Sequence, residues 1–210
     1  MSRAETHHDS DWKDGFLFLG NQLALDFLNT RPVLNGEATE LLPDFSALLR
    51  WFQAADLLSS RKAAKLEQDW RRSARAQRTL EALRELRERL RKQMIAWEDD
   101  GTVHSSTIEE LNQLMQMHPM RSRLKKRGNE STMEQYFEAQ QPEDLFAPLA
   151  YGAAALFANV DRSRVRKCDN CVLHFQDTSK KGTRRWCSMR FCGNRLKVAA
   201  YAARRAGRGK

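Results

Sequence analysis

The chain has 210 residues, which is enough for one medium domain or for one domain with a small module, and excludes a large multidomain protein. Its 41% hydrophobic residues can form a core, while 30% charged residues and a mean hydropathy of −0.69 describe a highly charged chain and argue against wholesale disorder. No apolar stretch approaches the roughly 20 residues of a membrane helix, and the first residues lack the apolar segment of a secretory signal, so we expect a cytoplasmic protein with no membrane partner.

The net charge of +9 is distributed unevenly along the chain. Residues 161–210 hold 15 Lys and Arg against three Asp, a net charge of +12, whereas residues 1–160 hold 21 against 24 acidic residues, a net charge of −3. A segment this cationic suits a polyanion, because each neutralised phosphate releases condensed counterions; an acidic membrane surface is the weaker alternative. We therefore expect a first domain at 1–160 and a basic module at 161–210.

The first sixty residues predict a short strand and two helices. Phe16–Leu19 favours the strand, and Asn21 is the expected N-cap of the first helix. Asp44 is the expected N-cap of the second helix, because the apolar residues after it recur at the i, i+3, i+4 and i+7 spacing of one helix face: Phe45, Leu48, Leu49 and Phe52.

A long amphipathic helix is predicted next. The stretch from Ser60 to Trp97 is rich in Ala, Glu, Arg and Leu, and a break near Trp70 is left open. Its apolar side faces either the core, which is the preferred interpretation, or a dimer partner, and carries Leu80, Leu83, Leu90, Met94 and Trp97.

Two more helices and a hairpin complete the first domain. Ser106 has capping-box spacing to Glu109 at the start of a helix. Residues 121–138 contain Gly128–Asn129, a pair that supplies the positive φ angles of a tight turn, and predict a β-hairpin. A last helix is expected over residues 143–158, and residues 1–160 are therefore expected to be mainly helical.

All four cysteines lie in the basic module, in the pattern Cys168-x2-Cys171-x15-Cys187-x4-Cys192. In a reducing compartment, two close-spaced pairs indicate a metal site rather than disulfides. Four thiolates suit one structural Zn²⁺ in tetrahedral coordination and leave no position for a catalytic water. An iron–sulfur cluster uses the same ligands and stays open. His174 is an alternative ligand, although a surface or phosphate-contacting side chain is preferred for it.

The spacing also predicts the fold of the module. The segment between the two pairs favours a β-hairpin over residues 172–186, and the second pair lies at the start of a last helix near Met189, where the helix dipole favours thiolates. A turn, a hairpin and a helix around one metal make a treble-clef arrangement. The predicted fold is mainly α: a helical N-terminal domain with a small β-hairpin, followed by a treble-clef-like four-cysteine zinc module that ends in a basic helix.

Several motifs around the cysteines occur in the order typical of one family. They are Cys168-Asp-Asn-Cys171, Phe175-x-Asp177-x-Ser179, Arg184-Arg-Trp-Cys-Ser-Met189 and Cys192-Gly-Asn-Arg195. Over roughly residues 165–205 the chain resembles the CGNR zinc-finger family, and Phe18-Leu-Gly-Asn-Gln-Leu-Ala-Leu-Asp-Phe-Leu-Asn-Thr30 resembles the opening motif of the ABATE domain that precedes this finger in family members. The family is regarded as one of bacterial stress-induced transcription regulators. The resemblance therefore implies DNA binding by the zinc module and sensing by the ABATE domain. His174 departs from the family pattern, which usually has an apolar residue there.

A helix that starts near Met189 would present a polar and basic face, with residues at steps of three and four. In a major groove, Arg reads guanine and Asn reads adenine, although the same residues suit phosphate contacts alone. A solvated basic face without a partner is the alternative, and Asn194 and Arg195 are equally suited to supporting the zinc ligands. The predicted nucleic-acid contacts are Lys180, Lys181, Arg184, Arg185, Arg190, Asn194, Arg195, Lys197, Arg204, Arg205 and Arg208.

One polar cluster in the first domain is a candidate site for a small-molecule effector: Asp26, Asn29, Thr30 and Arg31. These side chains would supply donors and acceptors between the apolar walls of Phe27 and Trp51. The preferred alternative is that Asn29 and Thr30 satisfy the last carbonyls of a helix that Pro32 stops.

No catalytic motif is evident, since the sequence has no Gly-rich phosphate loop, no G-x-S-x-G and no H-E-x-x-H, and an enzyme is not expected. The favoured hypothesis is a zinc-dependent, DNA-binding transcription regulator with a helical sensor domain. An RNA-binding zinc protein and a zinc-stabilised protein-interaction module are the alternatives, and homodimerisation is left open.

Overall fold

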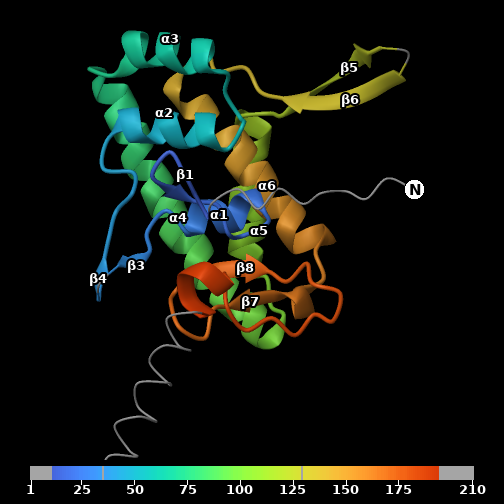
Figure 1. The fold of residues 1–210 in the computed structure, drawn as a ribbon. Helices are drawn as coiled ribbons and strands as arrows, with labels where there is room; N and C mark the ends of the chain where they lie inside the picture. The colour runs from blue at the N-terminus through green and yellow to red at the C-terminus, as the bar shows by residue number, and fades with distance from the viewer. Residues whose placement is uncertain (1–10, 35, 129, 194–210) are drawn as a thin grey trace, which may run out of the picture.

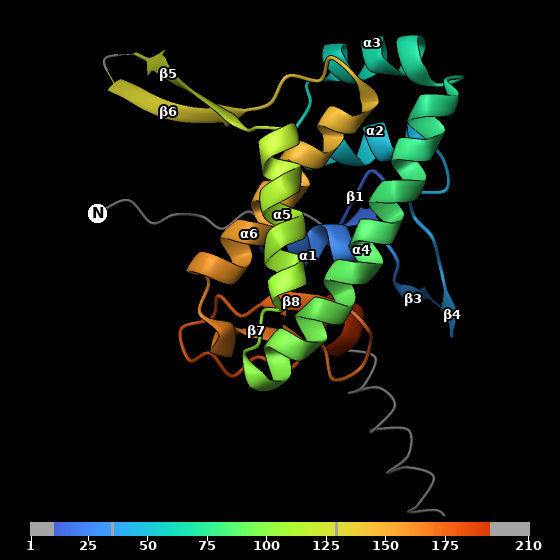
Figure 2. The same ribbon diagram turned by 180° about the vertical axis from the view of Figure 1, so that it is seen from behind.

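The computed structural model describes residues 11–34, 36–128 and 130–193. In these residues six α-helices surround the main core, and every strand belongs to a two-stranded antiparallel sheet. Helix α4 runs the length of the molecule, from α3 at one end to β7 and β8 at the other (Figure 1 and Figure 2). The predicted mainly helical fold is thus confirmed for this part of the chain. Among the described helices, none is long and apolar enough to cross a membrane.

The N-terminal segment forms two small hairpins on either side of a short helix. The strand expected at Phe16–Leu19 is present over its first two residues. Asn21 is not the helix cap, because Gln22 occupies the N-cap position. Asn21 has a φ of +58°, and its side chain donates a hydrogen bond to the carbonyl of Gln176. The elements are β1 (Trp12–Lys13), β2 (Phe16–Leu17), α1 (Leu23–Leu28), β3 (Val33–Leu34) and β4 (Glu37–Ala38).

Helix α2 (Phe45–Ala54) begins where the sequence predicts it. The Oδ1 atom of Asp44 accepts a hydrogen bond from the backbone N–H of Ala47 at 2.7 Å, which confirms the N-cap. The four apolar residues predicted for one face are all buried, because that face packs into the core.

The predicted long helix is two helices, α3 (Ser60–Trp70) and α4 (Ala74–Asp100). The break falls directly after Trp70, and the hydroxyl of Ser73 then accepts the backbone N–H of Ala76 and starts α4 anew. The five apolar residues expected on its inner side are all buried in the core, as preferred.

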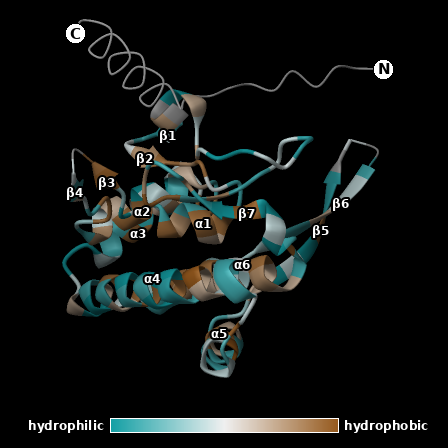
Figure 3. Ribbon diagram, turned by 90° about the horizontal axis from the view of Figure 1, so that it is seen from below, coloured by the Kyte–Doolittle hydropathy of each residue, from teal (hydrophilic) through white to brown (hydrophobic). Residues whose placement is uncertain are grey.

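Helix α5 (Ser105–Met117) starts with His104 at the N-cap position and no side-chain cap, so the capping box predicted for Ser106 is wrong. The predicted hairpin is confirmed: β5 (Arg121–Arg127) pairs with β6 (Glu130–Tyr136), and Arg127 lies opposite Glu130, which leaves Gly128–Asn129 as the connection. The hairpin projects away from the helices (Figure 1) and is largely hydrophilic in colour (Figure 3).

The last helix before the cysteine-containing module, α6 (Phe146–Asn159), follows a 3₁₀ turn at Pro142–Leu145 and packs against α1 and α5. Its start lies three residues later than predicted. Helix α1 is mostly hydrophobic, whereas α4 alternates hydrophilic and hydrophobic turns (Figure 3). This pattern follows from position, since α1 is surrounded by other elements and α4 exposes one face.

The module after α6 contains a 3₁₀ turn at Arg162–Arg164, β7 (Val165–Lys167), β8 (His174–Gln176) and a π-helical turn at Met189–Gly193. The hairpin predicted over residues 172–186 is wrong, because β8 pairs with β7 across the turn at 168–171. Residues 177–186 form an irregular loop instead. The basic helix was predicted to start near Met189. Residues Met189–Gly193 form the π-helical turn, and the rest of the predicted helix lies outside the described residues.

Candidate metal centre

Four cysteines converge at the end of the molecule opposite α3. Cys168 follows β7, Cys171 precedes β8, Cys187 ends the irregular loop and Cys192 lies in the π-helical turn. Their sulfur atoms all lie within 4.8 Å of one another. The sulfur of Cys187 is 3.7 Å from that of Cys171 and 3.6 Å from that of Cys192.

These distances fit a tetrahedral zinc site. Zn–S bonds of about 2.3 Å in a tetrahedron put neighbouring sulfur atoms about 3.8 Å apart. Three of the four thiols are buried and Cys171 is half-buried, so the group is largely shielded from water. The four predicted ligands are therefore brought together as a site for one structural Zn²⁺.

The thiols perturb one another strongly. The pKa of Cys168 is lowered because the thiols of Cys171 and Cys187 donate hydrogen bonds to its sulfur, and the same proton sharing raises the pKa of Cys171 to about 12. Four thiolates this close repel one another, and a divalent cation removes that repulsion by binding all of them. The donor set thus calls for a thiophilic cation at its centre.

Asp177 holds the irregular loop that leads to Cys187. Its carboxylate, which is buried, accepts the backbone N–H groups of Ser179 at 2.9 Å and Arg184 at 2.8 Å. Burial raises the pKa of Asp177, but the hydrogen bonds from Ser179 and Arg184 outweigh this effect, so the pKa lies below its ordinary value. The ionised carboxylate therefore folds this loop and places Cys187 near the other ligands.

Arg184 is bonded inside the module. Its guanidinium donates to the carbonyl oxygens of Trp186, at 2.8 Å, and of Cys187, and it lies over the ring of Phe175 at 4.8 Å. These contacts fix the backbone of a metal ligand. Arg184 was predicted to contact nucleic acid; in the structure its guanidinium donates hydrogen bonds to carbonyl groups of the module itself.

The other predicted nucleic-acid contacts divide into two groups. Lys180, Lys181, Arg185 and Arg190 are exposed on the module, although Arg185 also pairs with Asp169 at 2.6 Å and lies over a tryptophan ring. The remaining residues lie outside the described part of the chain: Asn194, Arg195, Lys197, Arg204, Arg205 and Arg208.

The hydrophobic core of the module includes the N-terminal segment. Leu17 and Leu19 pack with Leu173, Phe175 and the cysteines in one buried cluster. The hydroxyl of Ser188 also donates to the carboxylate of Asp11. Part of the range 1–160 thus contributes to the core of the range 161–210.

The outer edge of β8 is covered by residues that flank α1. The Asn29 side chain donates to the carbonyl of His174 at 2.9 Å and accepts its N–H at 3.0 Å. The carbonyl of Gly20 accepts the N–H of Gln176 at 2.8 Å, and the side chain of Asn21 donates to the Gln176 carbonyl at 2.9 Å. All four main-chain groups that face away from β7 are therefore paired, as a neighbouring strand would pair them.

His174 joins β8 to α4. Its side chain is buried, and its Nδ1 atom lies 2.7 Å from a carboxylate oxygen of Glu98. His174 is not part of the four-cysteine cluster, so it is not a zinc ligand there. Because its side chain is buried, the preferred prediction of a surface position is also wrong. The apolar position expected for the family is thus occupied here by a buried, hydrogen-bonded imidazole.

The four residues of the predicted effector cluster do not form one site. Asn29 binds β8, and the hydroxyl of Thr30 donates to the Phe27 carbonyl at 2.7 Å, as expected at a helix end. Arg31 forms an ion pair of 3.6 Å with Glu88 on α4. Asp26 lines a cavity.

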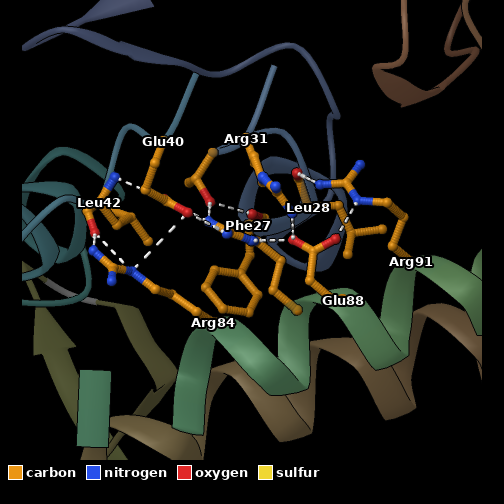
Figure 4. A network of polar contacts seen from close by, with 10 residues as sticks. Phe27, Leu28, Arg31, Glu40, Leu42, Arg84, Glu88 and Arg91 are labelled. Carbon is orange, nitrogen blue, oxygen red and sulfur yellow. Dashed lines mark hydrogen bonds and ion pairs between the residues drawn. The ribbon is translucent and has the colours of Figure 1, made fainter. Parts of the chain in front are cut away.

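Thr30 and Arg31 belong to a polar network that attaches residues 28–42 to α4, and Figure 4 shows Arg31, Glu40 and Leu42 facing side chains of α4. At its centre is Arg87, whose side chain is only 1% exposed and binds Thr30 at 2.8 Å. It also pairs with Glu40 at 2.5 Å and with Glu88 at 3.0 Å.

Arg87 was not predicted as a special residue, although the sequence contains a signal for it. It lies four residues after Leu83 and three before Leu90, which puts it on the apolar stripe of α4. A cation on such a stripe indicates a buried ion pair. Its charge and hydrogen bond outweigh the effect of burial on Glu40, and the pKa of that carboxyl is lowered.

The fold and the site define a mainly helical protein with a four-cysteine zinc module. Residues 21–160 match the ABATE family, described as "Putative stress-induced transcription regulator", and residues 164–205 match the CGNR zinc finger. The chain therefore belongs to the ABATE family and carries a CGNR zinc finger, which confirms the resemblance. Neither description names a catalytic activity. A comparison with curated proteins gives no match.

Proposed function

We propose that the protein is a zinc-dependent, DNA-binding transcription regulator whose basic module contacts DNA. The observation that carries the proposal is the coincidence of a four-cysteine zinc site with a net charge of +12 over residues 161–210. A small module of this charge binds phosphates favourably because counterions are released. Bacterial DNA lies in the cytoplasm, so the proposal locates the protein there.

The described part of the module supports this proposal with exposed cations beside the zinc site. Lys180 and Lys181 lie on the irregular loop, and Arg190 lies in the π-helical turn between two metal ligands. Because the zinc ligands Cys187 and Cys192 flank Arg190, metal binding fixes the backbone on both sides of it. The DNA-contacting surface would therefore depend on the metal.

The contacts of β8 offer a route from the helical domain to the zinc module. Asn29, the C-cap residue of α1, pairs with the main chain of His174, and Glu98 of α4 binds the side chain of His174. A ligand that shifts α1 would change the position of β8, which begins three residues after Cys171. We propose sensing by the helical domain on this basis.

Fluorescence anisotropy on a mixed-sequence duplex, over a series of salt concentrations, tests the proposal. Replacing both Lys180 and Lys181 with Gln should reduce the slope of log affinity against log salt by about two, if each touches a phosphate. The matched control replaces Lys125 and Lys126, two adjacent exposed lysines of β5 on the projecting hairpin, and should leave the slope unchanged.

Single-stranded RNA serves as the competitor in the same experiment. Binding that RNA does not displace supports a DNA-binding regulator. Preferential loss of the duplex to RNA would favour an RNA-binding zinc protein, and absence of both activities would favour a protein-interaction module.

A further inference from the structure

A cavity of about 450 Å³ lies between α1 and the end of α2. Its apolar walls include Phe18, Leu23 and Ala54, and the ring of Phe18 stacks on the buried Trp51 at a centroid distance of 6.1 Å. An apolar wall of this kind suits the hydrocarbon part of a small organic molecule.

The cavity has one buried carboxylate. Asp26 is 9% exposed, lines the cavity and accepts the backbone N–H of Gly20 at 2.7 Å. Burial raises its pKa to about 7, while hydrogen bonds from the backbone of Gly20 and Leu19 oppose this rise. A cation placed beside the buried Asp26 carboxylate would therefore stabilise its ionised form.

The remaining charges leave Asp26 as the group that a ligand would neutralise. Lys13 and Asp56 also line the cavity, but they pair with each other at 3.0 Å on its exposed rim. An anion would be repelled by the carboxylate of Asp26, whereas a cation would be attracted to this carboxylate and could also lie against the Phe18 ring.

Two residues that line the cavity, Asn21 and Gln22, also form hydrogen bonds with Gln176 of the zinc module. The Asn21 side chain donates to the Gln176 carbonyl at 2.9 Å, and the Gln22 side chain donates to that of Gln176 at 2.7 Å. A ligand against these two side chains would therefore touch residues that directly bind β8.

We propose that this cavity binds a small organic ammonium compound, with Asp26 as the counter-ion and Phe18 and Leu23 against its hydrocarbon part. The inference rests on the proposed function in one respect: the ammonium compound is the effector that the helical domain senses.

The test uses two ammonium probes, benzylamine and 1,4-diaminobutane, and the uncharged analogue benzyl alcohol. Amide NMR spectra of the full-length, zinc-loaded protein should show shifts at Gly20, Asn21 and Asp26 with at least one ammonium probe, and weaker shifts with the alcohol. Binding should be about tenfold tighter at pH 8 than at pH 6, since the carboxylate must be ionised.

Asp26→Asn should abolish ammonium binding, while the matched control Asp99→Asn, at an exposed position near the end of α4 and outside the cavity lining, should retain it. Ala55→Leu narrows the cavity and leaves the Asp26 carboxylate in place, so it should also abolish binding. It provides the test if Asp26→Asn does not fold. Absence of shifts with both ammonium probes, or equal binding of benzylamine and benzyl alcohol, would overturn the inference.

The outcomes for this site and for the proposed function are separable. DNA binding without ammonium binding would overturn the cavity assignment alone. Ammonium binding by a protein that binds no DNA would support the cavity and contradict the regulatory function.

Discussion

Asn29 is the residue whose replacement tests most sharply how the two parts of the molecule are joined. Its fully buried side chain pairs with both main-chain groups of His174. Asn29→Ala leaves a buried N–H and a buried carbonyl without partners, and each such group costs about 1–3 kcal/mol. We expect the free energy of unfolding to fall by about 2–6 kcal/mol.

Urea unfolding of the zinc-loaded protein measures this loss, and amide hydrogen exchange at His174 shows where it acts. The matched control Asn21→Gly removes one exposed hydrogen bond to the same strand, tolerates the φ of +58° at this position and should cost about 1 kcal/mol or less. Asn29→Asp should also be destabilising, because a carboxylate cannot donate to the His174 carbonyl. If Asn29→Ala lost no more stability than Asn21→Gly, with His174 equally protected, the proposed attachment would be refuted.

Three further predictions concern the helical domain. Arg87→Ala should lower the free energy of unfolding by about 3–5 kcal/mol, because Glu40 and Glu88 lose their buried partner. The exposed control Arg78→Ala should stay within about 0.5 kcal/mol of wild type. Equal losses of stability for the two variants in urea unfolding would contradict the importance of the Arg87 ion pairs. Gly20→Ala should lower the free energy of unfolding by about 1–3 kcal/mol, because the added Cβ would lie 2.6 Å from the Cβ of Leu25 and 2.8 Å from the backbone nitrogen of Asp26. The control is Gly152→Ala, whose Cβ would meet Leu23 at an ordinary 3.4 Å. Equal melting temperatures of the two variants would show that the added Cβ at residue 20 meets no steric clash. Because folded Asp26 keeps its proton up to about pH 7 while the unfolded chain releases it near 3.8, the stability of wild type relative to Asp26→Asn should fall by about 3 kcal/mol between pH 5 and pH 8; a difference independent of pH would show that Asp26 is not perturbed.

Local signals in the sequence predicted much of the helical domain. Helix α2 has its cap and apolar face within ten residues of one another, and the hairpin at residues 121–136 is determined by a two-residue turn. The zinc ligands were also predictable, because the metal selects cysteines by their spacing and residue type. In each case the contacts that determine the structure join residues close together in the sequence, or join the four cysteines through one zinc ion.

The contacts between distant segments could not be predicted in this way. Asn29 and His174 are 145 residues apart, and nothing near either residue indicates its partner. The predicted hairpin over residues 172–186 failed for a related reason: Phe175 and Trp186 suggest paired strands, but β8 is instead enclosed by β7 and by the segment around α1. Tertiary packing overrode the local pattern in both cases.

The central claim is that zinc creates the DNA-binding form of the protein. The most direct measurement is the anisotropy of a labelled duplex with the zinc-loaded protein, before chelation, after chelation and after zinc is added back. We predict salt-sensitive binding that disappears with the metal and returns with it. Equal affinity of the zinc-loaded and chelated protein for the duplex would contradict the account.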